Sequence, residues 1–415
     1  YIYTMSETST VNKADKAMGA VKNAFSNATE NFKALLKNKN KWGMLYLIFV
    51  IILVVWLLVL YVRGKLNLKY WNNNEMVNAY ESLGGTSISG INASNPKFRH
   101  KLRDYYVMAS YNSCCGGNVE KDFVDMIPLN TVMKQGARWL DFEIYSVKGE
   151  PVVAAGPEPS PDGKYCLKGT YNSLPVSNVL QQVRMLAFSG AQVPNPDDPL
   201  FLSFRIKTNN RNIYPILADK LKRIFSGRFL GPKYSYNGKY NKSGKDVIPN
   251  IPLLNLRKKV IIYIDDPNKN YRDTEFEEFI NMSGRGNDGS GMPFVKSYKN
   301  IDIVQAYDAG SITEENKKFL GITMPDFSKV TTNPPAAIHQ KYGCQFVMMN
   351  FSVLDANMQY YINFFGKRNG SAFVLKPDHL RYFEKIIAPP RRQNKDVSYA
   401  TKKMNLLGGS YTPGM

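Results

Sequence analysis

The chain has 415 residues, enough for one large domain or two small ones with a buried core, and 44% of them are hydrophobic. Its formal net charge of +20 at pH 7 predicts attraction to an anionic partner. The sequence has no zinc-finger spacing, no basic region leading into heptads and no paired aromatic RNA-binding motif, so we expect an anionic lipid surface and consider nucleic acid unfavoured. The four cysteines show neither metal-ligand spacing nor the pattern of a disulfide framework.

Residues 1–41 form a polar N-terminal segment with one apolar stripe. Apolar side chains recur there at steps of three and four, at Met18, Val21, Phe25, Ala28, Phe32 and Leu35. This spacing predicts an amphipathic helix that lies on a bilayer surface or pairs with a partner helix. We favour the surface helix, because three short heptads are few for a stable coiled coil.

Residues 42–62 (WGMLYLIFVIILVVWLLVLYV) are 21 in a row without a charged side chain. At about 1.5 Å per residue this run covers the hydrocarbon core of a bilayer, which predicts one transmembrane helix. Aromatic residues near both ends match the interfacial anchors of spanning helices: Trp42, Tyr46, Tyr61, Tyr70 and Trp71. We therefore expect a single-pass membrane protein with the lipid bilayer as its first partner.

Residues 63–95 are rich in Asn, Ser and Gly, which predicts a linker leading off the membrane. From about residue 96 to 390, short apolar runs alternate with polar or helix-compatible stretches such as 177–190 and 212–225. The expected strands cover residues 105–109, 138–145, 151–155, 200–206, 259–264, 301–306, 345–351 and 372–375. This pattern predicts an α/β fold, a parallel (β/α)8 TIM barrel. Residues 391–415 are basic, with Pro and Gly, and are expected to form an extended tail.

Several motifs resemble the catalytic barrel of phosphoinositide-specific phospholipase C, which consists of an X half and a Y half. GARWLDFE (136–143), GEPVV (149–153) and PLFLSF (199–204) resemble the X half. YGCQFVMMNFSVLDANMQYY (342–361) and NGSAFVLKPDHLR (369–381) resemble the Y half. The resemblance places the X half at 101–266 and the Y half at 292–385. It implies a distorted parallel barrel whose site lies at the carboxyl ends of the strands.

Both histidines that carry the acid–base chemistry of this family are absent from their positions. YVMASYNS (106–113) and GEPVVAAG (149–156) stand where the family reads roughly ASHNT and GEPVVYHG, so Tyr111 and Ala155 occupy the histidine positions. A phenol with an unperturbed pKa of about 10 is a poor base at neutral pH, and an alanine transfers no proton. We do not expect His100, His339 or His379 to substitute for them.

The resemblance also implies a changed metal site. Asn112 matches the family's calcium-binding asparagine, and Asp141 and Glu143 match its Glu-x-Asp pair in swapped order, both facing the barrel mouth. The third metal carboxylate corresponds to Arg205, whose guanidinium can bind two carboxylates. We expect no metal cofactor, because Arg205 replaces the calcium ion and pairs with Asp141 or Glu143, unless it turns outward to solvent. The family's two headgroup-binding lysines align with non-basic residues, Tyr263 and Asp265.

Three functions are compatible with this sequence. The favoured one is a membrane-anchored, catalytically inactive phospholipase C-like protein that acts as a structural or interaction module among other proteins of a large membrane-associated assembly. The virion of a large DNA virus with an internal membrane, or a protist organelle, would be a suitable setting, and the abundant Asn and Lys of an A+T-rich genome fit both. The alternatives are a divergent but active phosphoric diester hydrolase acting on phosphoinositides, and a non-catalytic phosphoinositide sensor, which Tyr263 and Asp265 disfavour.

Overall fold

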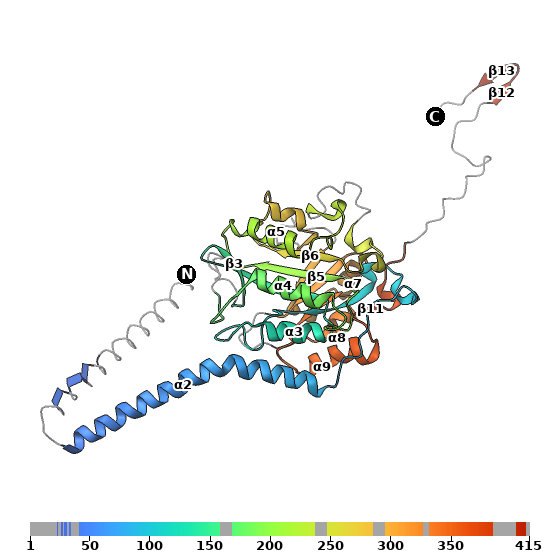
Figure 1. Cartoon of the computed structure of the whole chain (residues 1–415). Coiled ribbons are helices and arrows are strands. Elements are labelled where there is room, and N and C mark those ends of the chain that lie inside the picture. Colours follow the sequence, from blue (N-terminus) through green and yellow to red (C-terminus); the bar gives the residue numbers. More distant parts are fainter. Residues whose placement is uncertain are drawn as a thin grey trace.

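A computed structural model describes residues 41–157, 168–236, 247–284, 295–326, 332–384 and 404–411, together with a few helical positions between 23 and 34. Figure 1 shows one long N-terminal helix, α2, extending away from a barrel of strands and helices. The six residues of the amphipathic stripe expected in segment 1–41 lie outside the described residues. The surface helix therefore stays a prediction.

Helix α2 runs without a break from Lys41 to Ser82. Its apolar half has a mean hydropathy of 3.1, and none of that stretch is buried. By length and composition, α2 is the one helix among the described residues that is able to cross a membrane. The linker expected over 63–95 is wrong for its first part, since residues 63–82 continue the helix. Burial of Asn73, Met76 and Tyr80 against the barrel explains why an Asn-rich stretch of weak helix propensity stays helical.

Eight parallel strands form the nearly closed barrel, in the order β7-β6-β5-β2-β1-β10-β9-β8. Their bounds are β1 Tyr105–Ser110, β2 Trp139–Val147, β5 Leu200–Ile206, β6 Val260–Asp265, β7 Met282–Ser283, β8 Val295–Lys299, β9 Leu320–Met324 and β10 Phe346–Met349. The path of paired strands begins at β7 and ends at β8, which leaves a seam between them. The Tyr263 hydroxyl on β6 lies 3.0 Å from Ser297 Oγ on β8 and links the two sides of this seam.

Amphipathic helices cover the outside of the barrel (Figure 1). The expected helical stretches 177–190 and 212–225 are confirmed as α4 (Val176–Ala187) and α5 (Ile213–Ile224), each of which buries one apolar face. The other outer helices are α3 (Met126–Lys134), α7 (Ala309–Lys318), α8 (Ala336–Lys341) and α9 (Ala356–Asn363).

Two expected barrel strands are strands of another kind. Residues 151–155 belong to β3 (Glu150–Ala154), which forms a hairpin with β2 and pairs with it in antiparallel orientation. Residues 372–375 belong to β11 (Phe373–Leu375), which pairs antiparallel with β1. A short hairpin reverses the chain between β2 and β3, and β11 runs opposite to β1, so neither is a parallel barrel strand.

The expected strand 301–306 is wrong, because this segment is helix α6 (Asn300–Val304). The Asp302 side chain accepts a hydrogen bond from the backbone N–H of Lys299 at 2.8 Å and so caps the helix start. The β-branched side chains that favoured a strand are divided between solvent and core: Ile301 and Val304 are exposed, and Ile303 is buried. The strand in this part of the chain is β8, which ends at Lys299.

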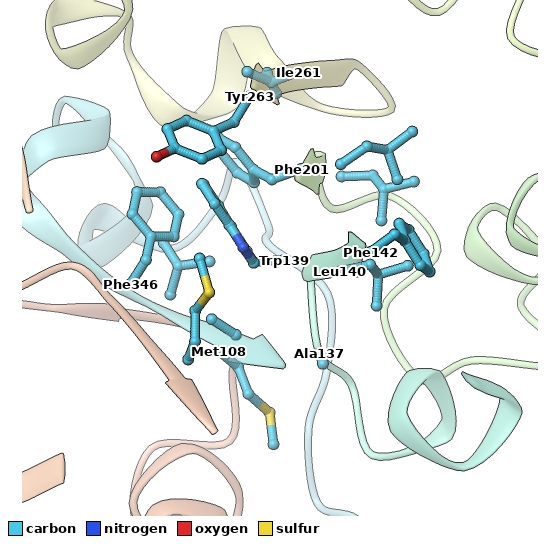
Figure 2. Close-up of a cluster of buried hydrophobic side chains, with 14 of the residues drawn as sticks. Met108, Ala137, Trp139, Leu140, Phe142, Phe201, Ile261, Tyr263 and Phe346 are labelled. Carbon is cyan, nitrogen blue, oxygen red and sulfur yellow. The ribbon is translucent and has the colours of Figure 1, made fainter. Parts of the chain in front are cut away.

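The barrel interior is filled by aromatic side chains around Trp139 (Figure 2). The Trp139 ring centroid lies 4.5 Å from that of Phe346, 5.3 Å from that of Tyr263 and 5.8 Å from that of Phe201. All four residues are fully buried. Such aromatic pairs contribute about 0.5–1.5 kcal/mol each beyond the area that they bury. The barrel interior is therefore a packed core, and only the carboxyl ends of the strands leave room for a site.

The C-terminal tail contains a hairpin where it is described. Strands β12 (Met404–Leu406) and β13 (Gly409–Tyr411) pair antiparallel, which differs from the extended tail expected for 391–415. The two turn residues, Leu407 and Gly408, have φ angles of 50° and 79°, the combination required by a tight two-residue hairpin.

Candidate functional site

The strand register places the expected site residues side by side at the carboxyl ends of β2, β5 and β6. Glu143 on β2 is paired with Arg205 on β5, which is paired with Asp265 on β6. This row therefore alternates in charge, with one cation between two carboxylates. A second row, two residues earlier on each strand, consists of Asp141, Ser203 and Tyr263. Because alternate residues of a strand share one face, both rows point the same way.

The Arg205 side chain points into this site and pairs with both carboxylates. Its Nε lies 3.1 and 3.0 Å from the two Asp141 oxygens, and its Nη2 lies 2.8 Å from Asp141 Oδ2. Its Nη1 forms an ion pair with Glu143 Oε1 at 2.9 Å. Exposed fractions are 2% for Arg205, 0% for Asp141 and 1% for Glu143. The outward orientation considered from the sequence is therefore wrong.

The loop after β1 contributes two further partners of the guanidinium. Arg205 Nη2 donates to Asn112 Oδ1 at 2.6 Å, and Nη1 donates to the Tyr111 hydroxyl at 3.2 Å. The guanidinium carbon also lies 4.3 Å from the centre of the Tyr111 ring, a cation–π distance. Asn112 has a φ angle of 43°, a left-handed conformation that asparagine tolerates better than most residues. This conformation lets its backbone N–H donate to Asp141 Oδ2 at 3.1 Å.

Three residues that the sequence reasoning missed complete the hydrogen bonding of the carboxylates. Ser203 Oγ donates to Asp141 Oδ1 at 2.8 Å. The Tyr145 hydroxyl and the Gly156 N–H donate to Glu143 Oε2 at 2.9 and 3.0 Å. Ser203 and Tyr145 lie two residues from Arg205 and Glu143 on the same strands. The period of two in a strand could therefore have indicated that they share a face with the site residues. Gly156 is brought in by the β2–β3 hairpin, which no spacing in the sequence indicates.

The electrostatics of the site are dominated by burial and by the ion pairs. Burial by itself lowers the pKa of the Arg205 guanidinium, but Asp141, Tyr111 and Glu143 outweigh it and hold this pKa well above its ordinary value. Burial raises the pKa of the Tyr111 phenol, and the neighbouring Arg205 offsets this only in part. A phenol with a raised pKa is an even poorer base at neutral pH than the sequence alone indicates.

The two positions that align with family lysines have different surroundings. Tyr263 is fully buried in the Trp139 cluster, and its hydroxyl contacts Ser297, so it packs the core (Figure 2). Asp265 is half-buried at the end of β6. Burial raises the pKa of its carboxyl, against the opposing influence of Arg205 and Lys207. Of the two positions that align with lysines, one therefore carries a carboxylate at the mouth, Asp265, and the other carries a core side chain, Tyr263.

Ala155 and the three histidines provide no proton-transfer group at the mouth. Ala155 is fully buried beside Gly156, whose N–H bonds Glu143. His379 is exposed in the short helix η9 (Asp378–Leu380), and His100 is half-buried before β1. His339 is buried in α8, where its Nε2 lies 2.9 Å from Asn300 Oδ1. Cys114 and Cys115 follow Asn112, but burial raises the pKa of both thiols, which disfavours the thiolate nucleophile.

The oxygens that would ligate calcium by the family resemblance bind the guanidinium here. Asn112 Oδ1, Asp141 Oδ2 and Glu143 Oε1 lie 2.6 to 2.9 Å from guanidinium nitrogens. Calcium requires six to eight oxygens at about 2.3–2.6 Å, and a divalent ion beside a buried guanidinium is repelled. Among the described residues, no group of three or more His, Cys, Asp or Glu side chains is arranged to hold a metal ion.

Comparisons with known proteins agree with this architecture. No family model matches the sequence, and no curated protein shows significant sequence similarity. Among solved structures, PLC21 of S. officinalis superposes with a TM-score of 0.56 and 19% identity over 72% of this chain, and PLC21 of L. pealei with 0.54 and 17% over 69%. A calcium-dependent phosphoinositol-specific phospholipase C from Pseudomonas sp. gives 0.40 and 13% over 68% of this chain and 97% of its own. The chain spans only 39% and 38% of the two PLC21 proteins, and the likeness establishes the fold, a phospholipase C-like barrel.

Proposed function

We propose that this protein is a membrane-anchored, catalytically inactive phospholipase C-like barrel that serves as a structural or interaction module in a larger membrane-associated assembly. The observation that carries the proposal is the buried Arg205 guanidinium, which occupies the oxygens of Asn112, Asp141 and Glu143. The fold is that of a phosphodiesterase, but its mouth is arranged as an internal ion-pair network.

The acid–base positions support the absence of turnover. Tyr111 and Ala155 stand where the family has its histidines, and Tyr111 is engaged with Arg205. Loss of one general acid or base typically slows a reaction by about 100- to 10,000-fold, and both are lost here. A phosphodiester bound at this mouth would meet neither a base for its attacking hydroxyl nor an acid for its leaving group.

The replacement of calcium by Arg205 is supported by charge and burial. A guanidinium between two buried carboxylates supplies the positive charge that an ion would supply, with a fixed planar geometry. It leaves no open coordination position for a substrate phosphate. Displacing it would leave a buried cation without its partners, which costs about 3–5 kcal/mol.

The membrane part of the proposal rests on α2 and on the net charge. The exposed apolar half of α2 is unsuited to water, and a formal charge of +20 favours an anionic lipid surface. The other partners are proteins of the assembly, and the setting that we propose for this assembly is the virion of a large DNA virus. Chemical crosslinking of the intact assembly, followed by identification of peptides joined to α2 or the barrel, tests this part.

An activity assay tests the inactive state. The full chain in mixed micelles is incubated with phosphatidylinositol 4,5-bisphosphate, with calcium and with a chelator, and we expect no hydrolysis in either case. The double variant Tyr111→His/Ala155→His should also be inactive, because Arg205 still occupies the metal position. The alternative, an active hydrolase that uses Arg205 as its cation, predicts wild-type hydrolysis that Arg205→Met abolishes, and that result would overturn our proposal.

A calcium-binding control separates the metal position from the rest of the site. Arg205→Glu restores a third carboxylate beside Asp141 and Glu143, and we expect calcium to raise the thermal midpoint of this variant. Calcium should leave the wild type unchanged, since its carboxylates are already paired. A rise of equal size in both proteins would show that Arg205 does not occupy the metal position.

A further inference from the structure

Helix α2 continues for twenty residues beyond the apolar run that ends at Val62. An unbroken helix fixes both the distance and the orientation between the two segments that it joins, whereas the flexible linker that the composition predicts would fix neither. Gly64 is the one glycine in this continuation, and a side chain added there would meet no atom within 4 Å. The continuation contains no proline. The barrel is therefore joined to the apolar half by a stiff connection.

The first contacts of this continuation are with the loop after β1. Lys69 Nζ lies 3.0 Å from Asp125 Oδ2, and Asn73 Nδ2 donates to the same oxygen at 2.6 Å. Asn72 Nδ2 donates to both oxygens of Asp122, at 3.0 and 2.8 Å. A Cβ at Gly117 would lie 2.4 Å from Asn72 Nδ2, so this glycine permits the close approach of loop and helix. The contacted loop follows the carboxyl end of a barrel strand and so belongs to the mouth of the barrel.

The last turn of α2 is still at the mouth end, because the Tyr80 hydroxyl donates at 2.8 Å to the carbonyl of Phe351, which follows the carboxyl end of β10. The ring centroids of Tyr80 and Phe351 lie 6.0 Å apart. After the helix, the chain passes toward the opposite end of the barrel. Beyond the helix, the Ile91 N–H donates to Asp198 Oδ1 at 2.7 Å, and Asp198 precedes β5. The Ile88 side chain packs on Gly136, which precedes β2. In Figure 1 the free end of α2 and the hairpin strand β3 lie on the same side, with β11 on the other.

We propose that α2 is a rigid spacer that points the mouth of the barrel, and not its base, toward the bilayer that the helix crosses. This inference rests on the membrane anchoring in the proposed function and is independent of catalytic inactivity. Its partner is the lipid headgroup surface on the barrel's side of the bilayer. The surface that meets it consists of the mouth loops around the β1–α3 connection, which α2 contacts first.

Distances along the helix place this loop close to the headgroups. Seven residues separate Val62 from Lys69 and eleven separate it from Asn73, which correspond to about 10 and 16 Å of helix. The headgroup layer takes up about 5–7 Å of this height, and a Debye length at physiological ionic strength is about 8 Å. The exposed side chains of Lys121 and Lys168 belong to the same part of the mouth, where the Lys121 N–H donates to the Gly169 carbonyl at 2.9 Å. Near an anionic surface each such lysine contributes about 1 kcal/mol.

Two lysines on one flank of the barrel provide a matched pair of reporter positions. Lys121 lies in the loop before α3, and Lys134 is the last residue of α3, toward the base; both are exposed. In the full chain with Cys166→Ser, a fluorophore is attached at Lys121→Cys or at Lys134→Cys. The cysteines Cys114, Cys115 and Cys344 are buried and protected from labelling. Energy transfer to a headgroup-labelled acceptor lipid is measured in phosphatidylserine and in phosphatidylcholine vesicles.

We expect higher transfer from position 121 than from position 134 in both kinds of vesicle. Gly64→Pro, which breaks the helix between the span and the barrel, should abolish this difference, whereas Gly64→Ala should preserve it. Equal transfer from the two positions, or an order seen only with anionic lipid, would overturn the rigid spacer. Flotation of the same samples tests the anchoring separately, because a chain that does not float with vesicles contradicts the proposed function itself.

Discussion

Replacing Arg205 by methionine is the most direct perturbation of the ion-pair network. Methionine is similar in length, so the change removes the guanidinium with little loss of packing volume. It leaves Asp141 and Glu143, which are 0% and 1% exposed, side by side without a counter-charge. Removing one partner from a buried pair costs about 3–5 kcal/mol. For a domain of this size we expect the thermal midpoint to fall by about 10 °C.

The assay is thermal unfolding of the full chain in detergent, followed by the near-ultraviolet signal of the buried Trp139 cluster. Arg257→Met is the matched control, because Arg257 pairs with Asp197 at the surface, where both side chains are 32–40% exposed. Such an exposed pair contributes less than about 1 kcal/mol. The triple variant Arg205→Met/Asp141→Asn/Glu143→Gln, which removes all three charges, should recover most of the lost stability. A single variant as stable as the control, or a triple variant no better than the single one, would refute the reasoning.

Three further predictions concern groups outside the ion-pair network. Burial lowers the pKa of His339 to about 4, so the unfolded chain binds a proton more readily between pH 4 and 6.5. The free energy of unfolding should therefore fall by up to about 3 kcal/mol as the pH drops through this window. Urea unfolding of His339→Gln should lack this pH dependence. Burial lowers the pKa of Lys376 to about 7, so stability should rise with pH from 7 to 10.5, and Lys376→Met should lack this rise when urea midpoints are compared at pH 7 and 9. Tyr80→Phe removes the donor to the Phe351 carbonyl and should cost about 1–3 kcal/mol locally, seen as faster hydrogen exchange in the second half of α2 with the barrel core unchanged.

The parts of the fold that the sequence predicts are those with an unbroken apolar run. All seven residues of β5 (LFLSFRI) are buried, and such a run indicates a strand covered on both faces. Strands β7 and β8 could not be found in this way. The first has only two residues, and the second (VKSYK) has a single buried residue, because it borders the seam of the barrel. Its polar side chains suit an edge strand, but in the sequence the same residues have the pattern of a loop.

The candidate site was predictable in composition but not in geometry. The spacing of Asp141, Glu143 and Arg205 on two strands indicates that they share a face, yet which atoms meet depends on the register between β2 and β5. That register pairs Arg205 with Glu143 and places it two residues beyond the partner of Asp141, so a single guanidinium reaches both carboxylates. The continuation of α2 was unpredictable for a different reason. Its helicity depends on contacts with the loop after β1, which lies far along the chain.

The chemistry of the mouth links stability to the proposed inactivity. Two buried carboxylates at the ends of neighbouring strands require a cation for the barrel to be stable at neutral pH. A bound ion supplies that charge only while it is bound, and it keeps coordination positions open for a phosphate. Arg205 supplies that charge through its own side chain, and under the proposed function it also closes those positions. We therefore expect a chelator to leave the unfolding of the wild type unchanged and to lower the midpoint of calcium-loaded Arg205→Glu. If the chelator also destabilises the wild type, a bound metal ion contributes to its stability and Arg205 does not replace it.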